Sequence, residues 1–332
     1  MTSTTNATAF LRTLDLFSDL SDREIEELAL TAVPFERSAG GYLFHQGDVA
    51  DAMYGIEEGT VRITVRMAGE EEVELVRVGA GAVVGEMGLV DADVRSASAA
   101  ATEALSGYRI DAAAFDVLRA AFRPSSCKVV RRLAELISSR IRATTLDLYG
   151  AADAPALNDA DRSPPVSSSR RHRQDPDLDH LLCLPIFGAF ARDEMADLLG
   201  EMDWLEVPRG CVIFETGDAP DACYVVTRGA VEATRFRGGG HEKIALWGPG
   251  RMVGEQALFS SEPRDVRATA REDCHLLRLE VEPFRRLFDE TSTIAFKLSD
   301  AATQQMVVAL RNLNRRRTWL TAHRGGRFHF FK

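Results

Sequence analysis

The sequence predicts a mainly β protein with flanking helices, built as two tandem antiparallel β-rolls of the jelly-roll type, each followed by a long exit helix. Three observations predict this fold. The chain repeats itself at an offset of about 170 residues, short β-runs alternate with glycine turns inside each copy, and a long amphipathic helix pattern follows each copy. Short strands at such spacing are typical of antiparallel rolls and barrels.

The internal repeat defines the domains. The segment "GDVADAMYGIEEG" at 47–59 aligns with "GDAPDACYVVTRG" at 217–229, and the alignment continues beyond a hairpin that is one residue shorter in the second copy. Glycine-glutamate pairs and a later arginine recur in register, as expected for a tandem duplication. The repeat predicts a first domain at 10–149, a flexible linker at 150–177, a second domain at 178–320 and a basic, aromatic tail at 321–332.

Local patterns predict the elements of each copy, here illustrated by the first. Residues 54–67 predict two strands around a glycine turn, 73–86 a strand closing on a glycine-rich turn, and 97–115 two more strands and the start of a helix. A capping box of Ser21 and Glu24 predicts a helix ahead of the first roll. The exit helices are expected at 125–148, opened by Ser125 or Ser126, and from about 291 to 320.

The composition is typical of a soluble globular protein, with 45% apolar and 27% charged residues. There is no run of eighteen apolar residues, and the N-terminus lacks the pattern of a secretory signal, so we expect a cytoplasmic protein without a transmembrane segment. The five cysteines and seven histidines show no metal-ligand spacing, and no nucleophile motif occurs. We therefore expect no metal, no catalytic residue, no catalytic cofactor and no enzymatic activity.

Charge is segregated along the chain. The net charge of −10 argues against broad nucleic-acid binding, yet residues 311–332 contain no acidic residue and several arginines, with Trp319 and Phe328 among their aromatics. This tail suits a protein groove, an anionic membrane face or nucleic acid, or is simply the basic end of a helix. The cluster at 170–173 in the linker is either a docking site or solvated charge.

In the stretch "GEMGLVDADVRSA" at 85–97, Glu86 and Arg95 are nine residues apart. The segment between them is long enough for a short helix. A glycine turn that enters a helix presents backbone N–H groups to an anion, and an arginine adds a bidentate clamp for phosphate oxygens. A glutamate suits a hydroxyl donor such as that of a ribose. A nucleotide whose phosphate closes back on its sugar offers both, whereas a surface ion pair, worth under about 1 kcal/mol, is the simpler alternative.

The surrounding motifs decide between these alternatives. The "GxxxFxxGD" pattern at 40–48, the "YxIxxG" pattern at 54–59 and the stretch at 85–97 together resemble the cyclic nucleotide-binding domain family, and the resemblance covers nearly all of the chain, twice. It implies that Glu86 accepts the ribose 2′-hydroxyl and that Arg95 clamps the cyclic phosphate. The anion site that it implies is completed by Ser96, Ala97 and the amides around Gly85 and Met87.

The first exit helix also resembles that of the bacterial catabolite activators. The resemblance implies that Thr144 and Thr145 meet the adenine, with Arg140 as a weaker candidate. The alternative is that both threonines lie on an exposed flank of the helix. Paired hydroxyls favour cAMP over cGMP as the ligand.

The second copy, "GEQALFSSEPRDV" at 254–266, has Asp265 and Val266 where the first copy has serine and alanine. A carboxylate about 5 Å from a phosphate costs about 3 kcal/mol at an effective dielectric constant of about 20. Asp265 pairing with Arg264 would also occupy the clamp. The second site is thus a weakened cyclic nucleotide site, a vacant pseudo-site or a site for another ligand. Its predicted residues are Gly254, Glu255, Gln256, Arg264, Asp265, Val266 and Asn314.

The sequence therefore predicts a cyclic nucleotide receptor or regulatory protein that binds ligand, most favourably cAMP, chiefly in domain 1. It would signal to an unidentified protein partner in trans through its exit helices and tail, since about twelve residues after the second helix are too few for a three-helix DNA reader. The exit helices would pair as a dimer or as a pseudo-dimer within the chain. The alternatives are a transcription regulator of the catabolite activator class without a recognisable helix-turn-helix, and a regulatory subunit of an enzyme or assembly.

Overall fold

The computed structural model describes residues 2–66, 72–91, 93–150, 177–237, 240–289 and 292–324. By contact density the chain divides into two compact units: the first is Met1–Ile137 with Val307–Lys332, and the second is Ser138–Met306. The cluster predicted at 170–173, nearly all of the predicted linker, and Phe328 in the tail lie outside the described residues. The domain boundaries expected from the repeat remain a prediction.

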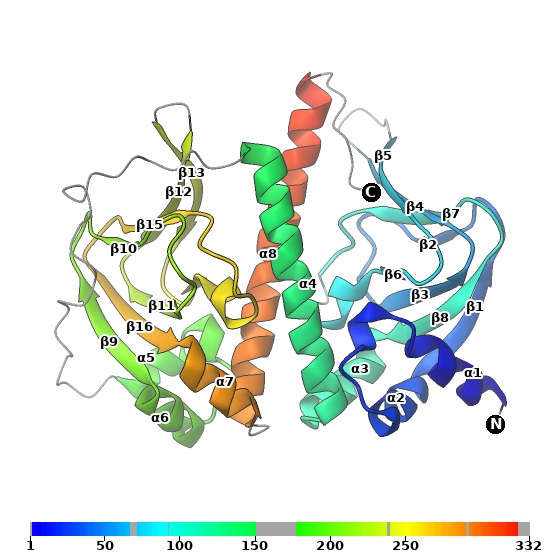
Figure 1. The fold of residues 1–332 in the computed structure, drawn as a ribbon, viewed down its shortest axis with the longest axis horizontal. Coiled ribbons are helices and arrows are strands. Elements are labelled where there is room, and N and C mark those ends of the chain that lie inside the picture. The colour runs from blue at the N-terminus through cyan, green and yellow to red at the C-terminus, as the bar shows by residue number, and fades with distance from the viewer. Residues whose placement is uncertain are drawn as a thin grey trace. The chain divides into compact units, whose positions relative to one another are not determined.

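The first unit contains a roll of two antiparallel four-stranded sheets (Figure 1). One sheet has the order β1-β8-β3-β6, and the other has the order β2-β7-β4-β5. The strands are β1 Ala32–Arg37, β2 Tyr42–Phe44, β3 Ala52–Glu58, β4 Val61–Arg66, β5 Glu72–Val78, β6 Val83–Val84, β7 Ser98–Ala101 and β8 Leu105–Asp111.

Apolar side chains from both sheets fill this roll. Tyr54, Ile56 and Val61 are buried against Ala99 and Leu105 in one cluster. On β4, Val61 is buried in this cluster and the partly buried Ile63, two residues later, packs against it. The β-roll prediction is therefore confirmed for this copy.

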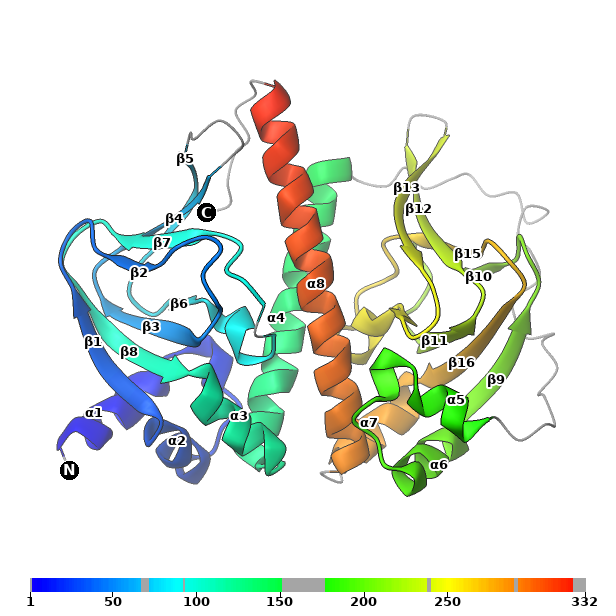
Figure 2. The ribbon, with the colours of Figure 1, turned by 180° about the vertical axis from the view of Figure 1, so that it is seen from behind.

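Short helices complete the first unit. They are α1 Thr2–Leu11, η1 Asp15–Phe17, α2 Asp22–Ala29, η2 Glu86–Leu89 and α3 Ala112–Ala120. Helices α1 and α2 lie side by side beneath β1 and β8 (Figure 2), and Phe10 of α1 stacks on Tyr108 at 5.4 Å between ring centroids. The predicted cap is present, since the Ser21 amide donates to Glu24 at 2.7 Å. Helix α1 was not predicted.

The second unit repeats this architecture. Its sheets have the orders β9-β16-β11-β14 and β10-β15-β12-β13. The strands are β9 Met202–Val207, β10 Val212–Phe214, β11 Ala222–Arg228, β12 Val231–Arg237, β13 Gly240–Trp247, β14 Met252–Val253, β15 Arg267–Ala270 and β16 Cys274–Glu280. The short helices are α5 Leu178–Leu182, η5 Pro185–Phe187, α6 Arg192–Gly200, η6 Glu255–Leu258 and α7 Val281–Asp289.

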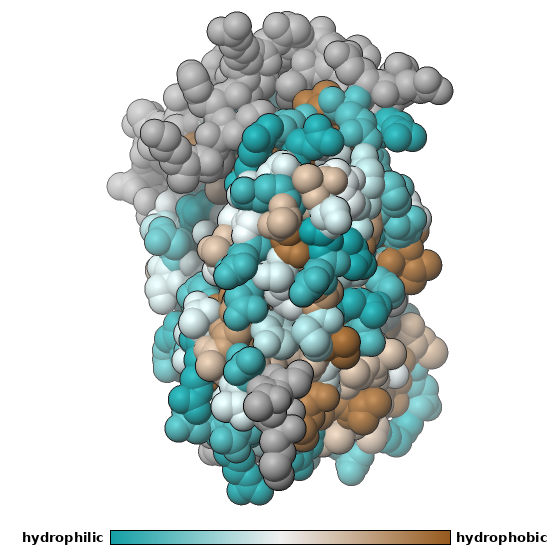
Figure 3. Space-filling model, turned by 90° about the vertical axis from the view of Figure 1, so that its right-hand side faces the viewer, coloured by the Kyte–Doolittle hydropathy of each residue, from teal (hydrophilic) through white to brown (hydrophobic). Residues whose placement is uncertain are grey.

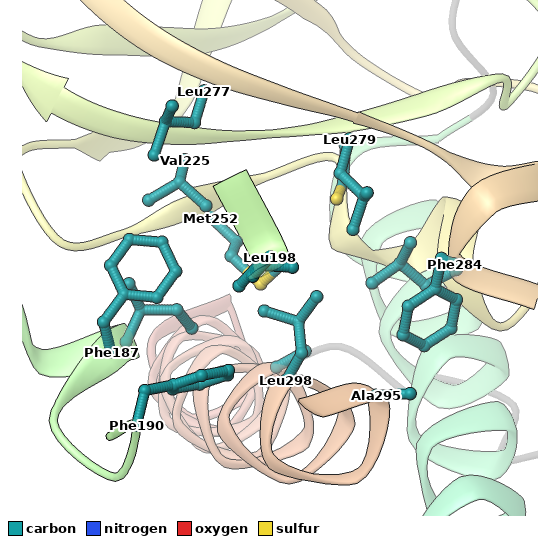
Figure 4. Packing of buried hydrophobic residues seen from close by; sticks show 14 of the residues in the cluster. Phe187, Phe190, Leu198, Val225, Met252, Leu277, Leu279, Phe284, Ala295 and Leu298 are labelled. Carbon is teal, nitrogen blue, oxygen red and sulfur yellow. The ribbon is translucent and has the colours of Figure 1, made fainter. Parts of the chain in front are cut away.

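Helices close one side of the second roll over a large apolar core (Figure 4). Phe187 and Phe190 lie edge to face at 5.9 Å between centroids, and Leu298 of α8 is buried in the same cluster as Val225 and Met252. Burying such side chains is worth about 1.5–3 kcal/mol each. This core fixes the first half of α8 to the second roll.

The two exit helices are α4 Pro124–Tyr149 and α8 Thr293–Arg324. Both agree with their predicted ranges. The predicted caps Ser125 and Ser126 are wrong, because the helix already begins at Pro124, a residue whose fixed φ suits the first helical turn. Instead, the Ser126 hydroxyl donates to the Arg123 carbonyl oxygen at 2.8 Å.

None of the helices in the described part of the chain is long and apolar enough to cross a membrane. On the face shown in Figure 3, hydrophilic residues predominate and the hydrophobic ones lie in small, separate groups.

Candidate functional site

The stretch 85–97, called the first cassette here, connects β6 to β7 through η2. It starts at Gly85, whose φ of +79° is in the left-handed region that favours glycine. A Cβ at this position would lie 2.5 Å from Nη1 of Arg95. The close approach of backbone and guanidinium therefore requires glycine on both steric and conformational grounds.

Arg95 is buried, and backbone oxygens hold its guanidinium. Nη1 donates to the Gly85 carbonyl oxygen at 3.2 Å, and Nη2 donates to that of Ala52 at 2.6 Å. Nη2 also pairs with Asp51 at 3.1 Å. Three acceptors on two elements fix the position of the guanidinium before any ligand binds.

The motif at 40–48 supplies the rest of the Arg95 support. The Phe44 ring lies under the guanidinium, 4.1 Å from its Cζ to the ring centroid. The Gly47 amide donates to the Arg95 carbonyl oxygen at 2.9 Å, and the Arg95 amide donates to that of Asp48 at 2.7 Å. The glycine, phenylalanine and aspartate of the motif thus act by positioning Arg95.

Glu86 lies beside this arginine as the first residue of η2 and is only 6% exposed. Burial lowers the pKa of Arg95, and the charges of Asp51 and Glu86 act in the opposite direction. Within the described chain, the Arg95 Nε is buried without a hydrogen-bond partner. Ser96 and Ala97 follow, both half-buried. The site combines a buried carboxylate acceptor with an arginine N–H that lacks an acceptor.

The second cassette, residues 254–266, has the same framework. Gly254 has a φ of +73°, and Arg264 Nη1 donates to its carbonyl oxygen at 3.1 Å. Arg264 Nη2 donates to the Ala222 carbonyl oxygen, and the guanidinium lies 4.4 Å over Phe214. The duplication has preserved the clamp in three dimensions as well as in sequence.

The two cassettes differ in their charges. Arg264 forms its ion pair with Asp221, at 3.7 Å, rather than with Asp265. Burial raises the pKa of Glu255 to about 7, and the half-buried Asp265 adds to this increase while Arg264 opposes it. The second site therefore holds an additional carboxylate close to a glutamate that already resists ionisation.

The predicted helix residues and their predicted cassettes belong to different compact units, so these pairings stay predictions. Thr144 and Thr145 are buried, not on an exposed flank, and belong to the second unit, where the Thr145 carbonyl oxygen accepts from Arg235 at 3.2 Å. Asn314 belongs to the first unit and is half-buried. Thr144 and Thr145 are thus in a different unit from the first cassette. Asn314 is likewise in a different unit from the second cassette. Arg140 is exposed.

The structure adds functional residues that the sequence reasoning missed. Arg311 of α8, 4% exposed, pairs with Asp91 at 2.6 Å and Asp93 at 2.9 Å in the first cassette. Asp51, which supports Arg95, recurs in the second copy as Asp221 at the 170-residue offset. The alignment of the two copies could therefore have identified Asp51 from the sequence. Arg311 has a counterpart 169 residues earlier, Arg142, which donates to the Pro263 carbonyl oxygen of the second cassette.

Across the described ranges, no three His, Cys, Asp or Glu side chains gather into a group able to hold a metal ion. The five cysteines are free thiols.

Comparison with known proteins identifies the chemistry of the two cassettes. The profile of the cyclic nucleotide-binding domain matches residues 35–121 and 204–291. The cyclic AMP receptor protein of Thermus thermophilus is 34% identical over 116 residues, which are 35% of this chain and 54% of that protein. The cAMP-dependent protein kinase regulatory subunit of Yarrowia lipolytica is 23% identical over 272 residues, covering 82% of this chain and 58% of the subunit.

Among solved structures, the regulatory domain of Toxoplasma gondii PKA with cAMP is similar over 87% of this chain and 93% of its own, with 18% identity and a TM-score of 0.35. The matched part of this chain spans about half the length of the Thermus thermophilus relative and less of several others. The chain belongs to the cyclic nucleotide-binding domain family and carries two of its domains in tandem. Its matched segments are similar to the cyclic AMP receptor protein and to the regulatory subunits of cAMP-dependent protein kinases.

Proposed function

We propose that this chain is a cAMP receptor that binds its ligand chiefly in domain 1 and signals to a protein partner in trans. The observation that carries nucleotide binding is the preformed clamp at Arg95; the clamp recurs at Arg264, whose Nε also lacks an acceptor in the described chain, so the choice of domain 1 rests on the carboxylate of Asp265 in the second copy. The Arg95 guanidinium is fixed by backbone oxygens and by Phe44, while its buried Nε has no acceptor in the described chain. A buried donor without an acceptor is costly, and a phosphate oxygen would satisfy it.

In this arrangement Arg95 holds the cyclic phosphate, and Glu86 accepts a hydrogen bond from the ribose 2′-hydroxyl. The backbone N–H groups at the start of η2, which lie beside Gly85 and Met87, add donors because the first amides of a helix have no partner within it. Ser96 offers a hydroxyl where the second copy offers a carboxylate. This difference supports binding chiefly in domain 1.

The choice of cAMP rests on relatives rather than on the exit-helix threonines. Thr144 and Thr145 belong to the second unit, so their place beside adenine at the first cassette stays a prediction. The support comes from similarity to a protein named a cyclic AMP receptor and to regulatory subunits of cAMP-dependent kinases. Since cGMP-dependent kinases are also similar, cGMP is the competing ligand.

Signal output would pass through α8. The pairs of Arg311 with Asp91 and Asp93 connect the first cassette directly to this helix. A ligand that changes the conformation of the cassette would therefore also shift the conformational equilibrium of α8. The partner would then bind the exit helices and the tail at 321–332, in a cytoplasmic protein without enzymatic activity of its own.

Titration calorimetry with cAMP and with cGMP tests the binding. We expect one cAMP per chain and weaker cGMP binding. Glu86→Gln should weaken the binding of cAMP. The matched change Glu255→Gln should leave the binding of cAMP unchanged. Absence of binding by both nucleotides would refute the proposed function, and hydrolysis of cAMP during incubation would refute the absence of enzymatic activity.

Removal of residues 321–332 tests the output. A receptor acting in trans predicts that the truncated chain still binds cAMP but no longer captures its partner in a ligand-dependent way. A transcription regulator predicts instead a salt-sensitive, cAMP-dependent shift of DNA that the truncation abolishes.

A further inference from the structure

The inner face of the second roll carries a cation that the first roll lacks. On β12, Val231 and Ala233 are buried in the roll core, and the alternation of a strand places Arg235 on the same inner face. The repeat aligns Arg235 with Val65 of the first copy. A guanidinium thus replaces an isopropyl group at this position, and it is only 6% exposed.

A carboxylate of the cassette acts electrostatically on this guanidinium. Burial lowers the pKa of Arg235, the carboxylate of Asp265 counteracts that effect more than any other group, and the neighbouring Arg142 adds to the lowering. Asp265 is the residue that stands where the first copy has Ser96. Two of the substitutions in the second roll thus introduce opposite charges, and the charge of Asp265 acts on Arg235 without a direct ion pair between the two side chains.

Arg235 also holds the helix that covers this roll. Its Nη1 donates to the Thr145 carbonyl oxygen of α4 at 3.2 Å, and its buried Nε has no partner among the residues described. The same helix contacts the second cassette twice more, where Ser138 donates to Gln256 at 3.3 Å and Arg142 donates to the Pro263 carbonyl oxygen. Helix, roll and cassette are thus connected by polar contacts that need no ligand.

We propose that Arg235 and Asp265 exclude cyclic nucleotides from the second domain by taking the place of the ligand. The Arg235 guanidinium supplies a built-in cation for Asp265 and a donor for α4, so that the second domain is held closed over its cassette without nucleotide. An incoming cyclic phosphate would meet Asp265 and would have to displace Arg235 from α4. The carboxylate alone weakens binding by about a hundredfold.

This proposal rests on the proposed cyclic nucleotide site in domain 1, which also provides the reference residues. The test is the double variant Arg235→Val with Asp265→Ser, which installs the residues of the first copy in the full chain. Calorimetry with cAMP should give one site in the wild type and two in the double variant. Each single variant should still give one site, since Asp265→Ser leaves Arg235 in place and Arg235→Val leaves Asp265 unneutralised.

Two results would overturn the proposal: two cAMP sites in the wild type, or a single site in a double variant whose circular dichroism is unchanged. Adding Ser96→Asp to the double variant separates the two proposals. Suppose that the wild type binds no cAMP, and that the double variant binds one cAMP per chain both with and without Ser96→Asp. That result would refute the function proposed for domain 1 but would support the role proposed for Arg235 and Asp265.

Hydrogen exchange on the wild type tests the same idea without any variant. With saturating cAMP, amides of the first cassette at 85–97 should gain protection, and those of the second cassette at 254–266 should not. Ligand-dependent protection of the second cassette equal to that of the first would contradict the exclusion of nucleotide by Arg235 and Asp265.

Discussion

Arg311 forms an ion pair with Asp91 across 220 residues of sequence, with 2.6 Å between Nη1 and Oδ2. The arginine is buried, and Asp93 accepts from the same nitrogen at 2.9 Å. The pair connects the second exit helix to the cassette of the first domain inside one compact unit. Helix α8 therefore contacts the first cassette through this arginine.

The first prediction concerns the stability of this contact. The double change Asp91→Asn with Asp93→Asn should lower the free energy of unfolding by about 2 kcal/mol, because it leaves a buried guanidinium without a counter-charge. Arg311→Met should lower the free energy of unfolding by a smaller amount. The two aspartates retain access to water, and the methionine packs in the space of the arginine. Urea unfolding measures both. The exposed pair of Arg77 and Glu74 is the control, and Arg77→Met should leave the free energy of unfolding nearly unchanged.

The second prediction uses the glycine that starts the cassette. Gly85→Ala should cost about 1–2 kcal/mol of stability from its positive φ, and should weaken cAMP binding at least about tenfold because the new Cβ displaces Arg95. Gly81→Ala is the matched control, with a φ of +81° and nothing within 4 Å of the added Cβ. It should show the stability cost alone. Equal loss of cAMP binding in both variants would show that the contact with Arg95 is irrelevant.

The third prediction transfers the altered residue from the second cassette to the first. Ser96→Asp should weaken cAMP binding by about a hundredfold, because a carboxylate then faces the phosphate. Ser96→Ala removes only a hydroxyl and should weaken binding by about tenfold or less. Calorimetry on the two variants gives the comparison. Similar affinities for both would mean that charge at this position does not decide which cassette binds.

The fourth prediction concerns pH and Glu255. Because burial raises the pKa of Glu255 from 4.5 to about 7 in the folded protein, the folded state holds more protons than the unfolded state between these values. Its contribution to stability is fully present below pH 4.5 and is lost as the pH rises through 7. Glu255→Gln should therefore be more stable than the wild type at pH 8, by up to about 3 kcal/mol.

Urea unfolding between pH 5 and pH 8 measures this difference. The same substitution at the exposed Glu262 of the second cassette is the control and should not change the pH dependence. A pH profile of Glu255→Gln that parallels the wild type would show that Glu255 ionises normally.

The sequence predicted the strands, the exit helices and the cassette framework because these depend on local patterns. Glycines 85 and 254 are both at positive φ, and Arg95 and Arg264 both lie over the phenylalanine of their motif. Such features repeat with the sequence since the same short stretch folds in the same way twice. Helix α1 escaped prediction because its first five residues, 2–6, are all polar, so its apolar residues lie only in its second half.

The assignment of Thr144 and Thr145 to the first site depends on tertiary packing and stays a prediction. An amphipathic helix carries an apolar seam, but the seam does not specify which roll each half of the helix covers. The structure places these threonines with Arg235 and places Arg311 with Asp91.

The sequence by itself determined that this protein has two cyclic nucleotide-binding domains, and that the second differs from the first by a carboxylate at position 265. Repeat, strand period and motif spacing are local, so they can be read along the chain. Only the tertiary structure decided that Arg235 donates to the Thr145 carbonyl oxygen and that Arg311 pairs with Asp91 and Asp93. Both depend on contacts between segments far apart in sequence, and packing and burial, rather than local propensity, determine such contacts.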